Sequence, residues 1–122
     1  MNTKRWRHAC FVDEATFSIF VAGGYDDQWN KLSSTEKWTF GHSSWQPSAN
    51  LPKAIHGSSA VPSNGNKYVA YLAGGSTRNL YSKAVFGLRR KDMRWIKMNK
   101  TMKRGRSYHS LSNIPAKQVL GC

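Results

Sequence analysis

Acidic side chains are scarce in this chain of 122 residues, which contains 6 Asp and Glu against 19 Lys and Arg. The formal net charge is +13, and the shortage is uneven, because residues 62–122 hold 13 of the cations and Asp92 as their one acid. Asp26 and Asp27 are adjacent, and neighbouring side chains of an extended segment point in opposite directions. The sequence therefore offers no pair of carboxylates suited to acid–base catalysis.

Cysteine is almost absent too, with only Cys10 and Cys122. Neither belongs to a Cys-x-x-Cys motif, and no histidine spacing completes a zinc site. Cys10 lies in a short apolar run, so we expect it to be a small buried hydrophobe. A disulfide between the two cysteines stays open, and the sequence predicts no metal and no other cofactor.

Long apolar runs are missing as well. No segment has the length of a membrane span, and the N-terminal residues lack the apolar core of a secretion signal, so the cellular compartment stays open. Helical periodicity is also missing, whereas short stretches rich in β-branched and aromatic residues recur. This pattern predicts an all-β fold.

The chain contains an internal repeat with a period of about fifty residues, which is typical of stacked supersecondary units. Each copy has a cation three residues before a histidine, then a strand that ends in two glycines, then a tryptophan. These landmarks are Arg5, His8, Gly23, Gly24 and Trp45 in the first copy, Lys53, His56, Gly74, Gly75 and Trp95 in the second, and Arg106 and His109 at the start of a third.

Each copy predicts four antiparallel strands. The first copy has candidates at 9–12, 17–22, 33–40 and from Trp45 onward, and the second at 57–61, 67–73, 82–88 and 95–98. Asn64-Gly65 supplies the positive φ angles of a tight hairpin. We expect the glycine pairs to end their strands in turns. We expect the two repeated tryptophans to fill equivalent gaps between units, each burying ~150–250 Å².

These recurring elements resemble the kelch repeat of the galactose oxidase-like superfamily, over roughly residues 5–112. The resemblance implies a partial kelch β-propeller, with two four-stranded antiparallel blades plus one extra strand. Two departures occur in the second copy, which has Lys53 in place of arginine and no acidic residue to match Glu36. The implied units are blade one at about 8–52, blade two at about 56–103, the start of a third repeat at 106–114, and a tail at 115–122.

Two blades do not close a propeller, because kelch rings have about five to seven of them. An unclosed pair exposes flat, partly apolar faces and a free strand edge. We therefore expect either a piece of a larger protein, which is the favoured reading, or self-association of copies to complete a propeller.

The resemblance implies a non-catalytic scaffold that binds a protein partner through loops on one face. Cations before the first strand and in the loops would make charge-assisted hydrogen bonds to an acidic segment, and aromatic side chains would add apolar contact. The candidate partner-binding residues are Arg5, Arg7, Tyr25, Trp29, Lys53, Arg78, Tyr81 and Arg106.

A basic patch predicted at residues 89–106 is the basis of an alternative function. Such a surface attracts an acidic protein, a sulfated glycan or nucleic acid, although aromatic residues are not interleaved with it as single-strand binding requires. A solvated rim whose acidic counterpart lies in other blades is the favoured interpretation of this charge. The patch consists of Arg89, Arg90, Lys91, Arg94, Lys100, Lys103 and Arg104.

A fragment of a copper-radical oxidase is the remaining alternative. That chemistry needs two histidines, tyrosine ligands and a cysteine crosslinked to a tyrosine. His8, His56 and His109 occupy one repeated position, which favours backbone bonding in separate units over a shared metal. No Gly-x-Ser-x-Gly elbow occurs either. The sequence therefore predicts that the chain is not an enzyme.

Overall fold

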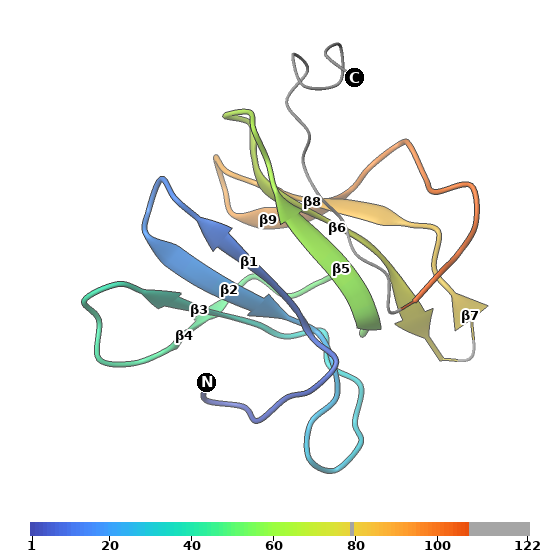
Figure 1. Cartoon of the computed structure of the whole chain (residues 1–122), viewed down its shortest axis with the longest axis horizontal. Helices are drawn as coiled ribbons and strands as arrows, with labels where there is room; N and C mark the ends of the chain where they lie inside the picture. Colours follow the sequence, from blue (N-terminus) through green and yellow to red (C-terminus); the bar gives the residue numbers. More distant parts are fainter. Residues whose placement is uncertain (79, 108–122) are drawn as a thin grey trace, which may run out of the picture.

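The computed structural model describes residues 1–78 and 80–107 of the chain. Throughout this part the structure is all-β, with strands in two antiparallel sheets and no helix (Figure 1). The prediction of an all-β fold is therefore confirmed. None of the described segments is a helix long and apolar enough to span a membrane.

Both sheets are antiparallel meanders, and the second has one short extra strand beside its path. The first sheet has the order β1 (Ala9–Asp13), β2 (Ser18–Ala22), β3 (Thr35–Thr39) and β4 (Gln46–Ser48). The second has the order β5 (His56–Pro62), β6 (Tyr68–Thr77), β8 (Val85–Arg89) and β9 (Arg94–Lys97), and β7 (Leu80–Tyr81) pairs with β6 outside this path. The four strands expected from each copy are present, whereas β7 was not predicted.

The two glycine pairs differ in their surroundings. Gly23 and Gly24 follow the end of β2, as expected. The prediction was wrong for Gly74 and Gly75, because β6 continues through them to Thr77. The short strand β7 supplies backbone partners for this extension, so the chain stays extended beyond the glycines.

Backbone hydrogen bonds repeat along the chain at the spacing of the sequence repeat. The amide of the first glycine of each pair donates to the residue before the third strand, and the carbonyl of the second glycine accepts from a residue eight or seven positions later. These bonds are Gly23 N to Ser34 O (3.0 Å) and Gly74 N to Ala84 O (3.2 Å), and Leu32 N to Gly24 O and Ser82 N to Gly75 O (both 2.8 Å). The two sheets are thus built on one local plan.

A second recurring bond ties each sheet to the segment that follows it. Gly24 N donates to Ile55 O at 2.8 Å, and Gly75 N donates to Arg106 O at 2.7 Å. In both copies the segment after the sheet therefore returns to the glycine pair. A chain that returns in this way starts its next unit from the same end of the sheet.

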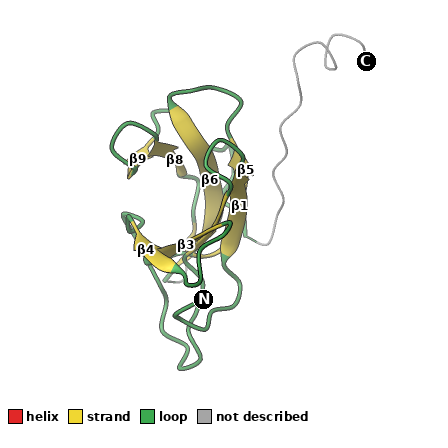
Figure 2. Cartoon of the chain, turned by 90° about the vertical axis from the view of Figure 1, so that its left-hand side faces the viewer, coloured by secondary structure: helices red, strands yellow, loops and turns green. Residues whose placement is uncertain are grey.

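The hydrophobic core lies between the two sheets. Because side chains alternate across a strand, each sheet turns one set of residues inward. Phe11 stacks on Phe20 at 4.8 Å, and Trp95 of the second sheet meets Phe11 edge-on at 6.0 Å. Figure 2 shows the sheets adjoining at β1 and β5 and spreading apart toward β4 and β9. The core residues that the sheet strands contribute are Ala9, Phe11, Phe20, Ala22, Val69, Ala70, Leu72, Phe86, Leu88 and Trp95.

The repeated tryptophans are not equally buried. Trp95 is 6% exposed and packs on the first sheet, whereas Trp45 is only half-buried. By alternation along β4, Trp45 belongs to the outer face of the first sheet, on which the described part of the chain packs no second sheet. The expected gap-filling role therefore applies to Trp95 but not to Trp45.

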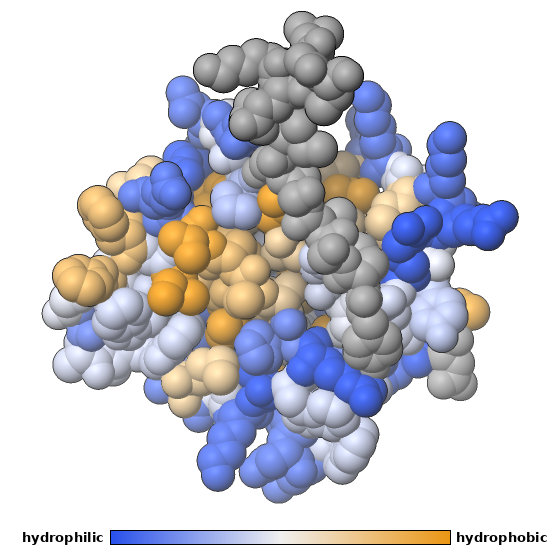
Figure 3. Space-filling model, viewed as in Figure 1, coloured by the Kyte–Doolittle hydropathy of each residue, from blue (hydrophilic) through white to orange (hydrophobic). Residues whose placement is uncertain are grey.

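Cys10 is exposed, so the expectation that it is buried was wrong. In β1 the residues alternate, with Phe11 buried and Cys10 and Val12 turned outward. An apolar run in a strand that is covered on one face only places half of its side chains in solvent. Figure 3 shows apolar side chains gathered over β1 and β2. Cys10 is a free thiol, and Cys122 lies outside the described residues.

Replacing Gly23 by alanine should destabilise the fold more than replacing Gly41. Both glycines have positive φ, +68° for Gly23 and +89° for Gly41. A methyl group at Gly23 would overlap the carbonyl oxygen of Ile55, whereas a methyl group at Gly41 would meet no atom within 4 Å. We expect Gly41→Ala to lower the free energy of unfolding by about 1 kcal/mol and Gly23→Ala by at least ~3 kcal/mol, measured by urea denaturation. Equal losses would contradict the close approach of the Ile55 segment.

Candidate ligand-binding groove

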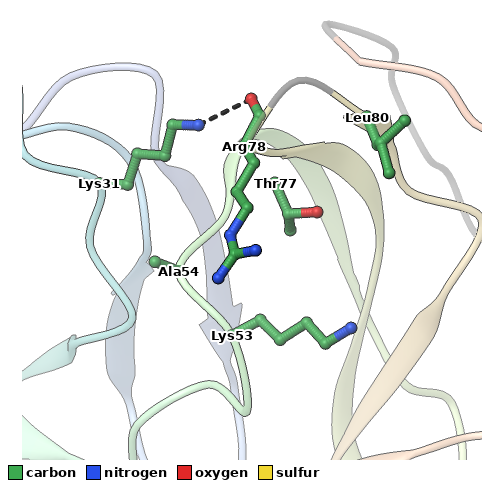
Figure 4. A pocket seen from close by; sticks show the side chains of 6 residues that line it. All are labelled: Lys31, Lys53, Ala54, Thr77, Arg78 and Leu80. Carbon is green, nitrogen blue, oxygen red and sulfur yellow. Dashed lines mark hydrogen bonds between the residues drawn. The ribbon is translucent and has the colours of Figure 1, made fainter.

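Three cationic side chains from separate segments meet at one groove. Lys31 follows β2, Lys53 precedes β5, and Arg78 follows β6. Together with Ala54, Thr77 and Leu80 they line a volume of about 580 Å³, and none of these lining residues is acidic (Figure 4). We call this site the cationic groove. Its composition suits an anionic ligand that also has some apolar surface.

The positions of these cations are partly set by the protein itself. The Lys31 ammonium donates a hydrogen bond to the carbonyl oxygen of Arg78 at 2.7 Å. Figure 4 shows the Arg78 side chain extending from the β6–β7 turn toward Ala54 and Lys53. The Lys53 and Arg78 side chains are exposed. Their charged groups can therefore reach a ligand without breaking the fold.

An aromatic cluster borders the groove. Trp6, Tyr25 and Trp29 pack together, with ring centroids 4.5 Å apart for Trp6–Trp29 and 5.2 Å for Trp6–Tyr25. Tyr25 pairs with Lys31 through the backbone, which links the cluster to the groove. The Arg7 guanidinium lies 4.4 Å from the centre of the Trp6 ring, in cation–π geometry. Trp29 is 67% exposed and offers an apolar contact surface.

The loops that carry these residues have unusual backbone angles. Arg7, Trp29 and Arg78 have φ of 56°, 64° and 52°, in the left-handed region that side chains other than glycine rarely adopt. The other two such residues in the described part, Phe17 and Met93, lie in β-hairpin turns. Strained positions persist where the surroundings hold them, and they often gather at binding sites.

The loop after β2 is closed by one carboxylate. Asp26 accepts hydrogen bonds from the Asn30 side-chain amide at 3.0 Å and from the backbone amides of Asn30 and Gln28 at 2.8 and 2.9 Å. The bonds from Asn30 come first among the causes that lower the pKa of Asp26 below its ordinary value. The loop that presents Trp29 and Lys31 is therefore organised by its own contacts.

Tyr25 also contacts His56. The Tyr25 hydroxyl lies 3.2 Å from His56 Nε2, and the two rings are 4.3 Å apart. Burial, and then the charges of Lys31 and Arg7, lower the pKa of His56 below its ordinary value. The histidine that the repeat marks as structural is thus close enough to Lys31, a lining residue of the groove, to feel its charge.

Arg5 is a candidate binding residue that lies away from the surface. Its side chain is fully buried and donates to the carbonyl oxygens of Gly23 and Ser34 and to the Glu36 carboxylate at 2.8 Å. Burial favours neutral Glu36, but bonds from the amides of Asn2 and Thr3 and from Arg5 hold its pKa below the usual value. Arg5 therefore has an internal contact instead of a free guanidinium.

Tyr81 and Arg106 lie near the second glycine pair and not in the groove lining. Tyr81 is 68% exposed in β7, and its backbone packs against Gly105. The carbonyl oxygen of Arg106 accepts the Gly75 amide, and the Arg106 side chain is exposed. The two residues form a neighbouring surface at the same end of the second sheet.

The predicted basic patch divides between two ends of the second sheet. Arg89, Arg90, Lys91 and Arg94 surround the β8–β9 turn, whereas Lys100, Lys103 and Arg104 follow β9, where Met102 N bonds to Lys83 O before the start of β8. At the turn, Arg89 pairs with Asp92 at 2.6 Å and Arg90 with Asp13 at 3.0 Å. Arg89 lowers the pKa of Asp92 to about 2. Two of the four cations of this turn are therefore neutralised locally.

The remaining repeated histidines are separate. Burial, and then the charge of Arg5, lower the pKa of His8 below its ordinary value. His109 lies outside the described residues. Across residues 1–78 and 80–107, no three His, Cys, Asp or Glu side chains are grouped closely enough to hold a metal ion.

Comparison with models of known protein families and with curated proteins found no match to this chain.

Sequence reasoning missed Lys31 and Trp6. Lys31 is the one cation in the segment 25–32, which lies between the first glycine pair and the strand predicted at 33–40. A cation isolated in a candidate binding loop was therefore a usable signal. Trp6 has no counterpart in the second copy, and only the pairing of its backbone with Tyr25 shows that it belongs to the site.

Replacing Lys31 by glutamine should raise the pKa of His56. The Lys31 ammonium disfavours the charged imidazolium, so its removal makes protonation easier. The folded pKa lies below the reference value of 6.5, so the stabilisation linked to neutral His56 is lost as pH falls below that value. NMR titration of the imidazole resonances measures the shift. The control Lys91→Gln, at the opposite end of the molecule, should leave the pKa of His56 unchanged. An unchanged His56 pKa in Lys31→Gln would contradict the proximity of Lys31 to His56.

Proposed function

We propose that this chain is a non-catalytic interaction module that binds an acidic segment of a protein partner in the cationic groove. The observation that carries the proposal is the meeting of Lys31, Lys53 and Arg78 around one volume that no acidic residue lines. Carboxylates of the partner accept charge-assisted hydrogen bonds from these groups, which are stronger than neutral ones.

The aromatic cluster gives the groove a second kind of contact. Trp29 and the partly buried Tyr25 present flat apolar surface beside the cations. Leu80, which is 73% exposed, adds apolar surface on the other side. A segment that alternates acidic and apolar side chains would use both, and aromatic and arginine residues are the usual anchors of protein interfaces.

The groove is a better candidate than the β8–β9 turn. Arg89 and Arg90 of the turn already pair with Asp92 and Asp13. A ligand would have to compete with these carboxylates, which reduces the gain from each contact. The polyanion-binding alternative is therefore less supported at the turn than acidic-peptide binding at the groove.

We also infer that the two sheets are two blades of a kelch-type β-propeller. The inference is supported by the repeated landmarks, the meander order of both sheets, and the recurring bonds at the glycine pairs. The packing of Trp95 against the preceding sheet is a further support. On this reading the groove lies on the loop-bearing face through which kelch proteins commonly bind partners.

Binding of a fluorescent peptide of alternating Glu and Leu residues tests the proposed function. Lys31→Gln, Lys53→Gln and Arg78→Gln should each raise Kd about three- to tenfold, because each removes a charge-assisted hydrogen bond. Lys91→Gln and Arg94→Gln remove the same charge from the β8–β9 turn and should have little effect. Anisotropy titrations at two ionic strengths measure both the affinity and its screening by salt.

Two results would contradict the groove as the binding site. One is an equal loss in the groove variants and the turn variants, which would indicate attraction by net charge alone. The other is undiminished peptide binding in a variant that lacks all three groove cations. Competition by heparin that tracks the turn variants would favour the polyanion alternative.

A further inference from the structure

The two sheets contribute different, non-equivalent faces to the contact between them. The first sheet offers Phe11 and Phe20, and the second sheet offers Trp95, Leu88 and their neighbours. The repeat register makes Trp45 equivalent to Trp95, and Tyr71 equivalent to Phe20. The outer-face residues of the first sheet are therefore equivalent to the residues with which the second sheet contacts the first. Likewise, the outer-face residues of the second sheet are equivalent to those with which the first sheet contacts the second.

The outer face of the first sheet is apolar and uncovered. Val12 is 46% exposed and Ile19 is 38% exposed, and the two pair across β1 and β2 beside the free thiol of Cys10. Half-buried Trp45 lies on the same face, and the patch is visible over β1 and β2 in Figure 3. Contiguous exposed apolar surface of this kind marks an interaction site.

The outer face of the second sheet is apolar and hollowed. Tyr71, Val85, Met98 and Met102 line a volume of about 410 Å³ together with the uncharged Asn99 and Thr101 and the cation Lys100. Gly87 has no side chain here, and Tyr68 and Met98 lie over it. The hollow occurs beside Tyr71, which is the position equivalent to the one where Phe20 lies in the internal contact.

The high net charge does not oppose contact between these faces. On the first sheet, Glu36 is paired with Arg5. On the second, Arg89 and Arg94 lie at the turn end of the strands, and Arg89 is paired with Asp92. Lys100 is the one charged residue that lines the hollow, and its side chain is exposed. The other contact residues named on the two outer faces are apolar or uncharged, so the chain itself carries both halves of a complementary pair.

We propose that the chain associates head to tail with a second copy, so that the outer face of its first sheet packs on the outer face of the copy's second sheet. Trp45 then packs on Val61 and Tyr71 beside the hollow, as Trp95 packs on Phe11 within one chain, because Val61 pairs with Tyr71 as Phe11 pairs with Phe20. Such a contact is heterologous, so each dimer keeps one free face of each type and can extend or close into a ring. The inference rests on the repeat, and it is independent of the cationic groove.

Lysine substitutions on the two faces test the direction of the contact. Ile19→Lys blocks the first outer face. Val85→Lys blocks the second, as does Ile96→Lys, because Ile96 pairs with Gly87 on that face. Wild-type mass in sedimentation equilibrium should rise with concentration, whereas each variant alone should stay monomeric. An equimolar mixture of Ile19→Lys with Val85→Lys should form a complex that stops at two chains, because one intact pair of faces remains. Asn64→Lys adds the same charge at an exposed hairpin and should assemble as the wild type does.

Cys10 reports on the same contact without a substitution in either face. In a Cys122→Ser background, alkylation of Cys10 should slow as protein concentration rises, since a second copy covers the thiol. A wild-type protein that is monomeric and labels at one rate at all concentrations would overturn the proposal. So would assembly that only the Ile19→Lys change abolishes, because this indicates a symmetric contact between two first sheets. Peptide binding by the monomeric variants tests the groove separately.

Discussion

The bond from the second glycine of each pair to the segment behind it is the constraint on which the rest of the structure depends. Gly24 donates to Ile55 O and Gly75 to Arg106 O, so each sheet holds the chain that leaves it. The absence of a side chain at Gly23 leaves room for the Ile55 carbonyl. Because the chain returns to the same end each time, the β2–β3 loop, the segment before β5 and the β6–β7 turn come together. The groove is a consequence of this repeated return.

The distribution of charge gives the two ends of the molecule different properties. Around the β8–β9 turn, Arg89 forms an ion pair with Asp92, and Arg90 forms one with Asp13. In the loop that carries Lys31, Asp26 accepts hydrogen bonds from Asn30 of the same loop. Lys31, Lys53 and Arg78 share the groove with no acidic lining residue. Of the net charge of +13, the part at the groove is therefore available to a ligand, and aromatic side chains lie beside these cations. The faces of the sheets, by contrast, interact through apolar contact.

Much of the strand plan was predictable from period-two patterning, whereas the glycine pairs marked the end of a strand only in the first copy. The burial of equivalent residues was not, since it depends on whether a sheet packs on that face: Trp45 and Trp95 share a register position but not an environment. Arg5 and Lys53 match in sequence, yet only Arg5 has a carboxylate partner, Glu36. The second copy has Phe86 at the position equivalent to Glu36. Lys53 therefore lacks the carboxylate that holds Arg5 in the interior, and it lies at the surface. The sequence could place Lys31 in a candidate loop, but its meeting with Lys53 and Arg78 required the fold, because these residues come from distant segments.

An NMR titration of the ¹⁵N-labelled protein with the acidic peptide tests the central claim most directly. The account predicts that the largest shifts fall on the backbone amides of Lys31, Ala54 and Thr77 and on the indole N–H of Trp29. Residues 89–94 at the opposite end should change little. Shifts centred on the β8–β9 turn, or spread evenly over all exposed cations, would contradict the claim that the fold assembles a binding groove at the glycine pairs.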